Sequence, residues 1–503
     1  MQGRTTGWLE RRIETVLPTL QDFLRLAPEA LLASAGLLLL LVGTIGRGLG
    51  NRHSALVAMA SLVLTAIDLY AVWRSVPGRL LIFDGSFVID GFAIFWKVLV
   101  LIATALTILL SIRFLEEGGY RAAEYYSLLL LASSGMMLMA SGYTLLTIWI
   151  ALETMALSSY ILAGYFKRHL RSNEAALKYF ILGALSSGIL LYGISLLYGA
   201  TGTVQLGELA HGLASANANG DVLVPLGWLL LAAGLFFKVS AVPFHIWAPD
   251  VYVGAPTPVT AYLAVASKAA SFAILIRIFY EGLGTAIQAD WQWVLAAVSA
   301  ATMIWGNLAA LTQDNVKRML AYSSIAHAGY VLIGVLAASE IGLWSVIFYL
   351  LAYTFVTLGV FAMVILLERK EYAGETCADY AGLAQRSPFL AAMMVIFLVA
   401  LTGIPPTGGF FGKVYLFAAA VQAGWTWVAV VGVVTSAISL YYYFRIVVYM
   451  YQQDSTANTP VPLQAPALVA AIALCAFATI LLGVYPEPFI QMAKNSLISL
   501  GGR

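Results

Sequence analysis

The sequence predicts an all-α polytopic membrane protein with about 14 transmembrane helices. Its 503 residues are 61% hydrophobic and only 10% charged, whereas soluble domains carry about 25% charged residues. Apolar runs of about 20 residues, enough to cross a hydrocarbon core about 30 Å thick, follow one another along the chain. Lysine and arginine gather in alternate loops between these runs. The apolar excess therefore predicts lipid-facing surface rather than a soluble core.

The first expected element is a short interfacial segment over residues 1–27. It is too acidic and too interrupted for a signal peptide, so we expect it to stay on the mature chain. The apolar runs that follow predict the spans, at residues 28–47, 54–74, 91–113, 124–141, 143–165, 174–199, 224–247, 257–280, 291–311, 319–337, 341–366, 387–421, 425–451 and 465–485.

Positive charge predicts the orientation of these spans. The odd-numbered loops and the helix ends beside them hold 14 Lys and Arg residues, and the even-numbered loops hold 3. The positive-inside rule places the odd loops in the cytoplasm, so that both termini lie outside. Arginines in the N-terminal segment oppose this orientation, but its glutamates and short length reduce their weight.

Two spans contain prolines that interrupt a helix. The seventh span has Pro243 shortly after Lys238, and the twelfth has Pro405 and Pro406 shortly before Lys413. Proline removes a backbone N–H and clashes with the preceding turn. Such backbone is tolerated at membrane depth only where protein or water covers it. Paired broken helices are typical of transporters built from inverted repeats.

Ionisable side chains inside spans indicate charge movement. Glu153, Lys238 and Lys268 lie deep inside their spans, and Lys413 follows the break in the twelfth. Each costs roughly 2.5–3.5 kcal/mol at the centre of a spanning helix, so such groups are functional candidates by default. The alternatives are a protonated, hydrogen-bonded Glu153 and lysines that reach the membrane interface.

Other polar residues favour structural roles. For Lys97 we expect the amine to reach the interface or to pair with Asp68 or Asp90. His327 is mid-span, where a proton relay and a core histidine bonded to a carbonyl are equally open. His245 and Asp250 are expected in a loop that closes the broken helix.

Glu174 and Lys178 are four residues apart on one helix face, and this spacing predicts an interfacial ion pair.

The two cysteines, Cys377 and Cys475, are too few for an iron–sulfur cluster held by this chain alone. Two histidines near membrane depth leave haem ligation open. The sequence has no nucleotide-binding glycine loop, metal-ligand cluster or nucleophile motif.

Three blocks of sequence resemble the antiporter-like membrane subunits of respiratory complex I. They read FFKVSAVPFHIWAPDVYVGAPTPVTAYLAVASKAASFAIL, GNLAALTQDNVKRMLAYSSIAHAGYVLIG and LTGIPPTGGFFGKVYLF, and lie within roughly residues 120–450. The resemblance implies 14 helices in which spans four to eight and nine to thirteen are inverted repeats with broken helices seven and twelve. The implied parts are residues 1–120, 121–285, 286–455 and 456–503.

The resemblance also implies roles for single residues. Glu153 matches the glutamate of span five that pairs with the lysine of span seven, here Lys238. Lys268 matches the central lysine of span eight, and Lys413 the lysine of span twelve near the exit. His327 falls where related subunits can have a polar residue on the central axis.

The function implied is proton translocation by a membrane subunit of a bacterial respiratory enzyme. No redox centre is expected in this chain, and NADH, FMN, iron–sulfur clusters and quinone are expected in partner subunits. The implied partners are subunit M and the small subunits K, J and A, in the bacterial inner membrane. Two alternatives remain: a cation/proton antiporter, stand-alone or multisubunit, and a scaffold that pumps nothing, although buried lysines disfavour a scaffold.

Overall fold

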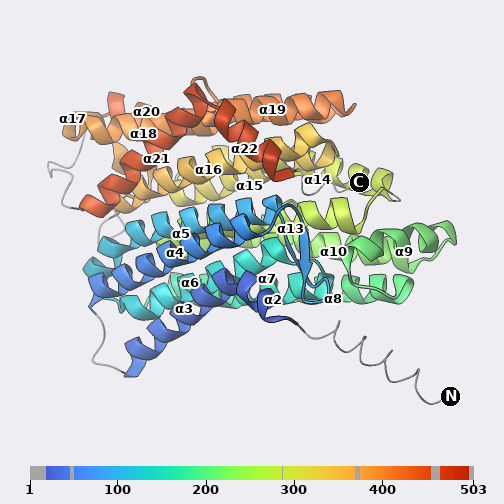
Figure 1. The fold of residues 1–503 in the computed structure, drawn as a ribbon. Coiled ribbons are helices and arrows are strands. Elements are labelled where there is room, and N and C mark those ends of the chain that lie inside the picture. Colours follow the sequence, from blue (N-terminus) through green and yellow to red (C-terminus); the bar gives the residue numbers. More distant parts are fainter. Residues whose placement is uncertain (1–17, 46–49, 286, 369–373, 455–464, 498–503) are drawn as a thin grey trace, which may run out of the picture.

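The computed structural model describes residues 18–45, 50–285, 287–368, 374–454 and 465–497. Its long helices lie roughly side by side and follow the chain from one side of the bundle to the other (Figure 1). The predicted interfacial segment 1–27 falls outside the described residues up to position 17. Its described part contains α2, at Leu20–Arg25, in which Leu20, Phe23 and Leu24 are exposed.

The first half of the chain forms α3 (Ala27–Ile45), α4 (Asn51–Ser75), α5 (Gly91–Gly118), α6 (Ala122–Ser141), α7 (Leu145–Ala163), α8 (Leu170–Thr201), α9 (Leu206–Ala218), α10 (Leu223–Val239) and α11 (Trp247–Gly254). One continuous helical rod follows, made of α12 (Thr257–Tyr262), the π-helical η1 (Leu263–Ser267), α13 (Lys268–Arg277) and the π-helical η2 (Ile278–Gly282).

The second half forms α14 (Gln288–Leu311), α15 (Val316–Leu336), α16 (Glu340–Leu367), the 3-10 helix η3 (Cys377–Tyr380), α17 (Leu383–Arg386), α18 (Pro388–Thr402), α19 (Gly408–Gln422), α20 (Thr426–Gln452), α21 (Pro466–Val484) and α22 (Glu487–Leu497).

The predicted all-α membrane fold is confirmed. Among the described residues, 11 helices are long and apolar enough to cross a membrane. The remaining predicted spans, 124–141, 224–247 and 387–421, overlap α6, α10 and the interrupted pair of α18 and α19. The seventh predicted span ends where α11 begins, so Asp250 lies in a helix and not in the expected loop. The total of 14 crossings and the division into inverted repeats stay predictions.

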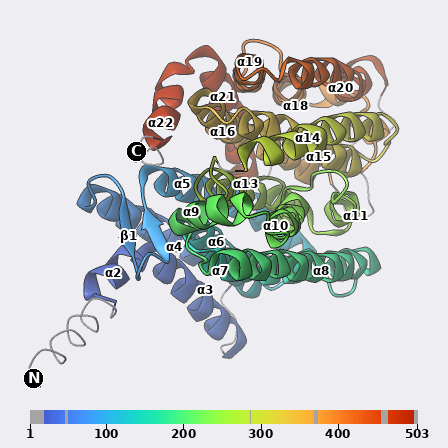
Figure 2. The same cartoon turned by 90° about the vertical axis from the view of Figure 1, so that its right-hand side faces the viewer.

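Burial separates central helices from those on the rim. The most apolar stretch of the rod Thr257–Gly282 is 100% buried, and those of α15 and α16 are 94% and 89% buried. The corresponding stretches of α4, α8 and α20 are only 39% buried. A view along the helices places α13 in the interior of the bundle (Figure 2). The helix that carries Lys268 is therefore shielded from lipid by its neighbours.

A short hairpin between α4 and α5 was not predicted from the sequence. Strands β1 (Leu80–Ile82) and β2 (Phe87–Ile89) pair antiparallel, with Leu80 opposite Ile89. Phe83 and Asp84, at the turn, have positive φ angles of 50° and 51°, as a tight hairpin turn requires.

Candidate functional site

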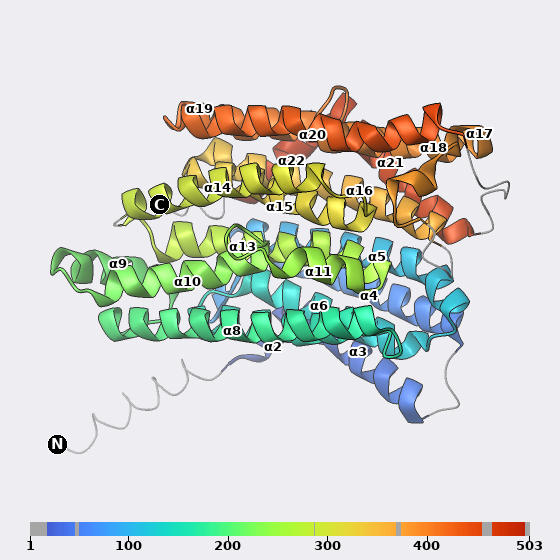
Figure 3. The same ribbon diagram turned by 180° about the vertical axis from the view of Figure 1, so that it is seen from behind.

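The first predicted helix break is confirmed at the end of α10. Ser240 takes a left-handed conformation with φ 60°, and α11 resumes along the same line (Figure 3). The indole N–H of Trp247 donates at 3.0 Å to the Phe237 carbonyl, which also accepts the Ser240 N–H at 3.1 Å. The Val242 N–H donates to the Thr302 hydroxyl of α14 at 2.9 Å. Neighbouring side chains thus satisfy backbone groups that the break releases within the bundle.

Lys238 lies in the last turn of α10, is 4% exposed, and its amine has no hydrogen-bond partner among the described residues. Glu153 is near enough to act on it electrostatically. The Glu153 carboxylate instead accepts the hydroxyl of Ser187, whose oxygen also accepts the Trp149 indole N–H at 2.9 Å. The structure therefore brings Glu153 and Lys238 to one region without direct contact between them.

The second predicted break, between α18 and α19, is also confirmed. The Lys413 amine donates to the carbonyls of Leu401 and Thr402, at 2.9 Å each, and to the Ser436 hydroxyl at 2.8 Å. Gly403 ends α18 with φ 87°, and a Cβ there would lie 2.9 Å from Cδ of Lys413. A side chain at position 403 would thus disturb both the turn and the lysine.

Lys268 begins α13 directly after the π-helical η1, and it is 3% exposed. Its amine donates to the Ser324 hydroxyl at 2.6 Å and to the Ser324 carbonyl at 2.7 Å. These bonds join the central rod to α15. Lys268 therefore lies inside protein, and its amine is held by neutral oxygens.

His327 lies one turn after Ser324 on α15 and is buried. Its Nδ1 is hydrogen-bonded to the Tyr349 hydroxyl, and its Nε2 lies 3.1 Å from the Tyr443 hydroxyl. The Tyr443 hydroxyl also bonds Ser323, beside the partner of Lys268. Both ring nitrogens thus have hydroxyl partners, and neither bonds the carbonyl expected of a simple core histidine.

Sequence reasoning missed the hydroxyl groups that surround His327. Tyr349 comes from α16 and Tyr443 from α20, so they reach the site from parts of the chain far from position 327. Buried tyrosines in apolar helices resemble ordinary core residues in a sequence. Nothing in the pattern around them distinguishes these two from other tyrosines.

The expectation for Lys97 is wrong in its partner and in its depth. The amine lies 2.5 Å from the carboxylate of Glu29, and both side chains are 1% exposed. Glu29 is in the first turn of α3. Neither Asp68 nor Asp90 makes this contact. Asp68 lies on α4, and the Asp90 carboxylate is bound by Arg277. Lys97 is therefore half of a buried ion pair between α3 and α5.

A second buried ion pair fixes the end of the central rod. Arg277 binds the two oxygens of Asp90 at 3.0 Å each and also contacts Glu281 at 3.1 Å. Asp90 caps α5 by accepting the Ala93 N–H at 2.7 Å. Burial raises the pKa of Asp90, but the charge and hydrogen bonds of Arg277 outweigh it and hold the pKa below its ordinary 3.8.

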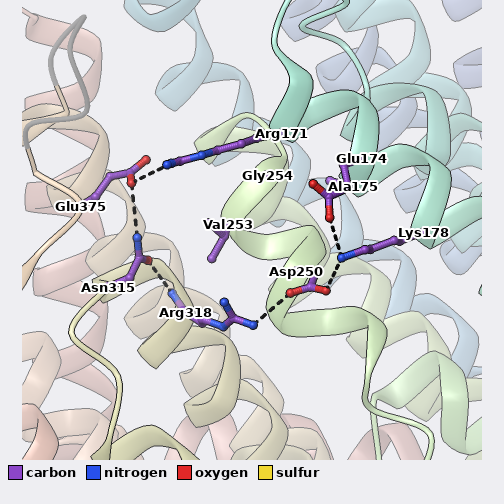
Figure 4. Close-up of a pocket in the computed structure, with 10 residues that line it drawn as sticks. All are labelled: Arg171, Glu174, Ala175, Lys178, Asp250, Val253, Gly254, Asn315, Arg318 and Glu375. Atoms are coloured by element: carbon purple, nitrogen blue, oxygen red, sulfur yellow. Dashed lines mark hydrogen bonds and ion pairs between the residues drawn. The ribbon is translucent and has the colours of Figure 1, made fainter.

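Charged residues line a cleft on the predicted cytoplasmic side (Figure 4). Asp250 of α11 bridges Lys178 of α8 at 2.7 Å and Arg318 of α15 at 3.1 Å. The predicted Glu174–Lys178 pair is confirmed at 2.7 Å. Asp250 lies within the helix α11, and His245 lies in the turn before it. The ion pairs of Asp250 thus link α11, the second part of the first broken helix, to α8 on one side and α15 on the other.

No group of three or more His, Cys, Asp or Glu side chains in the described part of the chain could hold a metal ion. The absence of redox cofactors from this chain stays a prediction.

Comparison with known proteins places this chain in a family. Residues 141–439 match the family described as "NADH:quinone oxidoreductase/Mrp antiporter, TM". NADH-quinone oxidoreductase subunit N 2 of Solibacter usitatus (strain Ellin6076) is 48% identical over 415 residues, which cover 82% of this chain and 84% of the relative.

Two solved structures have the same fold. A chain of respiratory complex I from Thermus thermophilus with bound Aureothin matches with a TM-score of 0.78 and 34% identity, over 93% of this chain and 99% of that chain. A chain of the Mrp complex from Dietzia sp. DQ12-45-1b matches with a TM-score of 0.79 and 26% identity, over 96% and 98% of the two chains.

The chain therefore belongs to the NADH:quinone oxidoreductase/Mrp antiporter family, among the antiporter-like membrane subunits of respiratory complex I.

Proposed function

We propose that this chain is the proton-translocating subunit N of an NADH:quinone oxidoreductase, in which quinone reduction elsewhere in the complex drives proton transfer along buried Glu and Lys residues. The observation that carries the proposal is the polar network inside the bundle. Lys268 bonds Ser324 of α15, and the neighbouring Ser323 and His327 of α15 both bond the Tyr443 hydroxyl of α20. A purely structural bundle gains little from such buried amines.

In the proposed cycle, the Glu153 carboxylate moves between Ser187 and Lys238. Its approach stabilises the charged amine and its withdrawal favours proton release, because Coulomb interaction is strong where water is excluded. The proton passes to Lys268 and then, by way of His327, to Lys413, from which it leaves to the outside. Hydroxyl groups and water can carry it between these side chains.

The proposal includes a setting for the chain. Subunit M and the small subunits K, J and A are its expected partners in the inner membrane of a bacterium, with both termini outside. NADH, FMN, iron–sulfur clusters and quinone belong to partner subunits. The high apolar content of the sequence supports a place in the membrane, and the loop charges support this orientation.

Substitution of Lys238 in the assembled complex tests the proposal. Lys238→Ala should abolish proton pumping into proteoliposomes while the complex still assembles. Lys167→Ala, at an exposed lysine, is the matched control and should pump normally. Normal pumping by a fully assembled Lys238→Ala complex contradicts the mechanism.

A second candidate is a subunit of a cation/proton antiporter, stand-alone or multisubunit. The similarity to a chain of the Mrp complex supports it. Co-purification in mild detergent separates the two: flavin and iron–sulfur subunits accompany the chain in the first case and are missing in the second.

A further inference from the structure

The ring of Tyr330 contacts both His327 and Lys413. Tyr330 is 1% exposed and comes one turn after His327 on α15. The Lys413 amine lies over its face, 4.7 Å from the ring centroid. The His327 ring meets it edge-on, with the centroids 5.6 Å apart at 85°. An aromatic face attracts an ammonium group but has no site that can accept and then release a proton.

The hydrogen bonds of Lys413 lead away from His327. Two of them end on backbone carbonyls, at Leu401 and Thr402, which have no proton to pass on. The third ends on the Ser436 hydroxyl, which donates to the Thr402 carbonyl at 3.1 Å and is also hydrogen-bonded to the Tyr330 side chain. The amine is therefore oriented toward the cut end of α18 and not toward the histidine.

A chain of side chains does pass round the ring, but an amide interrupts it. Tyr443, the partner of His327, is hydrogen-bonded to Tyr442. The Tyr442 hydroxyl donates to Oδ1 of Asn307 at 3.1 Å, and Nδ2 of Asn307 donates to the Tyr330 hydroxyl at 3.0 Å. An amide accepts a hydrogen bond at its oxygen and donates from its nitrogen. To relay a proton, it would have to be protonated at oxygen, lose a proton from nitrogen and so become the imidic acid tautomer.

Two residues that contact the Tyr330 ring, Lys413 and Phe417, border a cavity. Lys413, Phe417 and Ser436 line it together with residues of α18, α19 and α20. The Tyr330 and Phe417 rings meet edge to face at 6.0 Å. The Tyr330 ring thus packs against residues that line this cavity and also against His327, which belongs to the hydroxyl network.

We propose that Tyr330 is a gate that separates His327 from Lys413, and that its ring must swing aside to let water join them. In the open state the His327 imidazolium loses a proton and the neutral Lys413 amine gains it through the bridging water. In the closed state Asn307 holds the Tyr330 hydroxyl and fixes the ring in place. The inference rests on the proposed direction of transfer, and it adds the residue that prevents a passive leak.

The test is passive proton entry into proteoliposomes that contain the assembled complex, under an imposed pH gradient and without NADH or quinone. Tyr330→Ala removes the ring, and we expect leak through the complex to rise about tenfold or more. Tyr330→Phe keeps the ring but loses the hydroxyl that Asn307 holds, so its leak should be clearly smaller than that of Tyr330→Ala. Tyr126→Ala truncates another fully buried tyrosine, on α6, and controls for a cavity as such.

Asn307→Asp is the second variant, for the case in which Tyr330→Ala does not assemble. It keeps the shape of the side chain and places a carboxyl, which can relay protons, where the amide was; leak should rise here too. A tight complex with either opening variant overturns the gate, as does equal leak from Tyr330→Phe. Lys413→Ala separates the two proposals. If the Lys413→Ala complex still pumps, the proposed function fails. If that complex does not pump but Tyr330→Ala shows no leak, only the gate fails.

Discussion

The two broken helices close their cut ends with different donors. At the end of α10, the indole of Trp247 donates to the Phe237 carbonyl, and the Lys238 amine makes no hydrogen bond. At the end of α18, the Lys413 amine itself donates to the carbonyls of Leu401 and Thr402. One lysine is thus free of its own helix end, and the other is part of how that end is satisfied.

The difference indicates different duties for the two lysines. The Lys238 amine has no neutral acceptor among the described residues, and the charge of Glu153 acts on it. A movement of that carboxylate would therefore change the stability of the charged amine. Lys413 has three neutral oxygen partners. We infer that the first break responds to a moving charge, whereas the second holds its lysine in one place near the exit.

The largest effect is expected from Glu153→Gln. It removes the charge to which Lys238 responds while keeping the hydrogen bond from Ser187 available. Pumping should fall by more than about tenfold, to background, with assembly retained. The measurement is the ratio of protons pumped to NADH oxidised in proteoliposomes. Pumping at the unsubstituted ratio would remove the basis of the comparison.

The buried pair of Lys97 and Glu29 sharpens the comparison, because there a carboxylate touches its lysine permanently. Glu29→Ala leaves a buried amine unpaired, and loss of one partner of such a pair costs about 3–5 kcal/mol. We expect a lower melting temperature of the complex and a poorer yield of assembled subunit. Replacing both residues, Glu29→Gln with Lys97→Met, should recover most of the loss. Asp68→Asn, at the partner expected from the sequence, should have little effect.

Trp247→Phe tests whether the indole keeps Lys238 free. Without its N–H, the Phe237 carbonyl lacks a side-chain donor, and the Lys238 amine can turn onto it as Lys413 does at the other break. A hydrogen bond of about 1–1.5 kcal/mol then competes with Glu153, so pumping should slow about five- to tenfold. The pumping rate at saturating NADH measures this. An unchanged rate would mean that the indole does not set the behaviour of the lysine.

The smallest effect is expected from Ser436→Ala. It removes one of three neutral oxygens from Lys413, and the two carbonyls remain to hold the amine. The rate of pumping should change by less than about threefold, as for the loss of a single neutral hydrogen bond near 0.5 kcal/mol. A loss as large as that of Glu153→Gln would show that the second break is as sensitive as the first.

The sequence was sufficient to find the membrane fold, both helix breaks and the burial of Lys238, Lys268 and Lys413, because prolines and charged residues stand out in apolar runs. Pro243, Pro405 and Pro406 lie where α10 and α18 end. These signals are local, and the bilayer imposes them on every span.

Partners across the bundle could not be predicted in the same way. Glu29 is far from Lys97 in the chain, and its place in the first turn of α3 resembles an ordinary acidic helix start. The hydroxyl of Tyr443 and the ring of Tyr330 act through their position in three dimensions. A single sequence contains the residue types of this network but not which helices pack against one another.

The π-helical turn η1 has a consequence for insertions and deletions. Leu263–Ser267 form a wider turn than an α-helix, and Lys268 follows directly after it. Such a turn holds one residue more than an α-helical turn, so removal of one residue would restore regular winding with little rotation. Insertion of one further residue would instead rotate one end of the rod by about 100° against the other. Either Lys268 would turn away from Ser324, or Tyr262 would turn away from Ser133. Lengthening this short stretch would therefore break a contact of the central rod even though every side chain of the rod is kept.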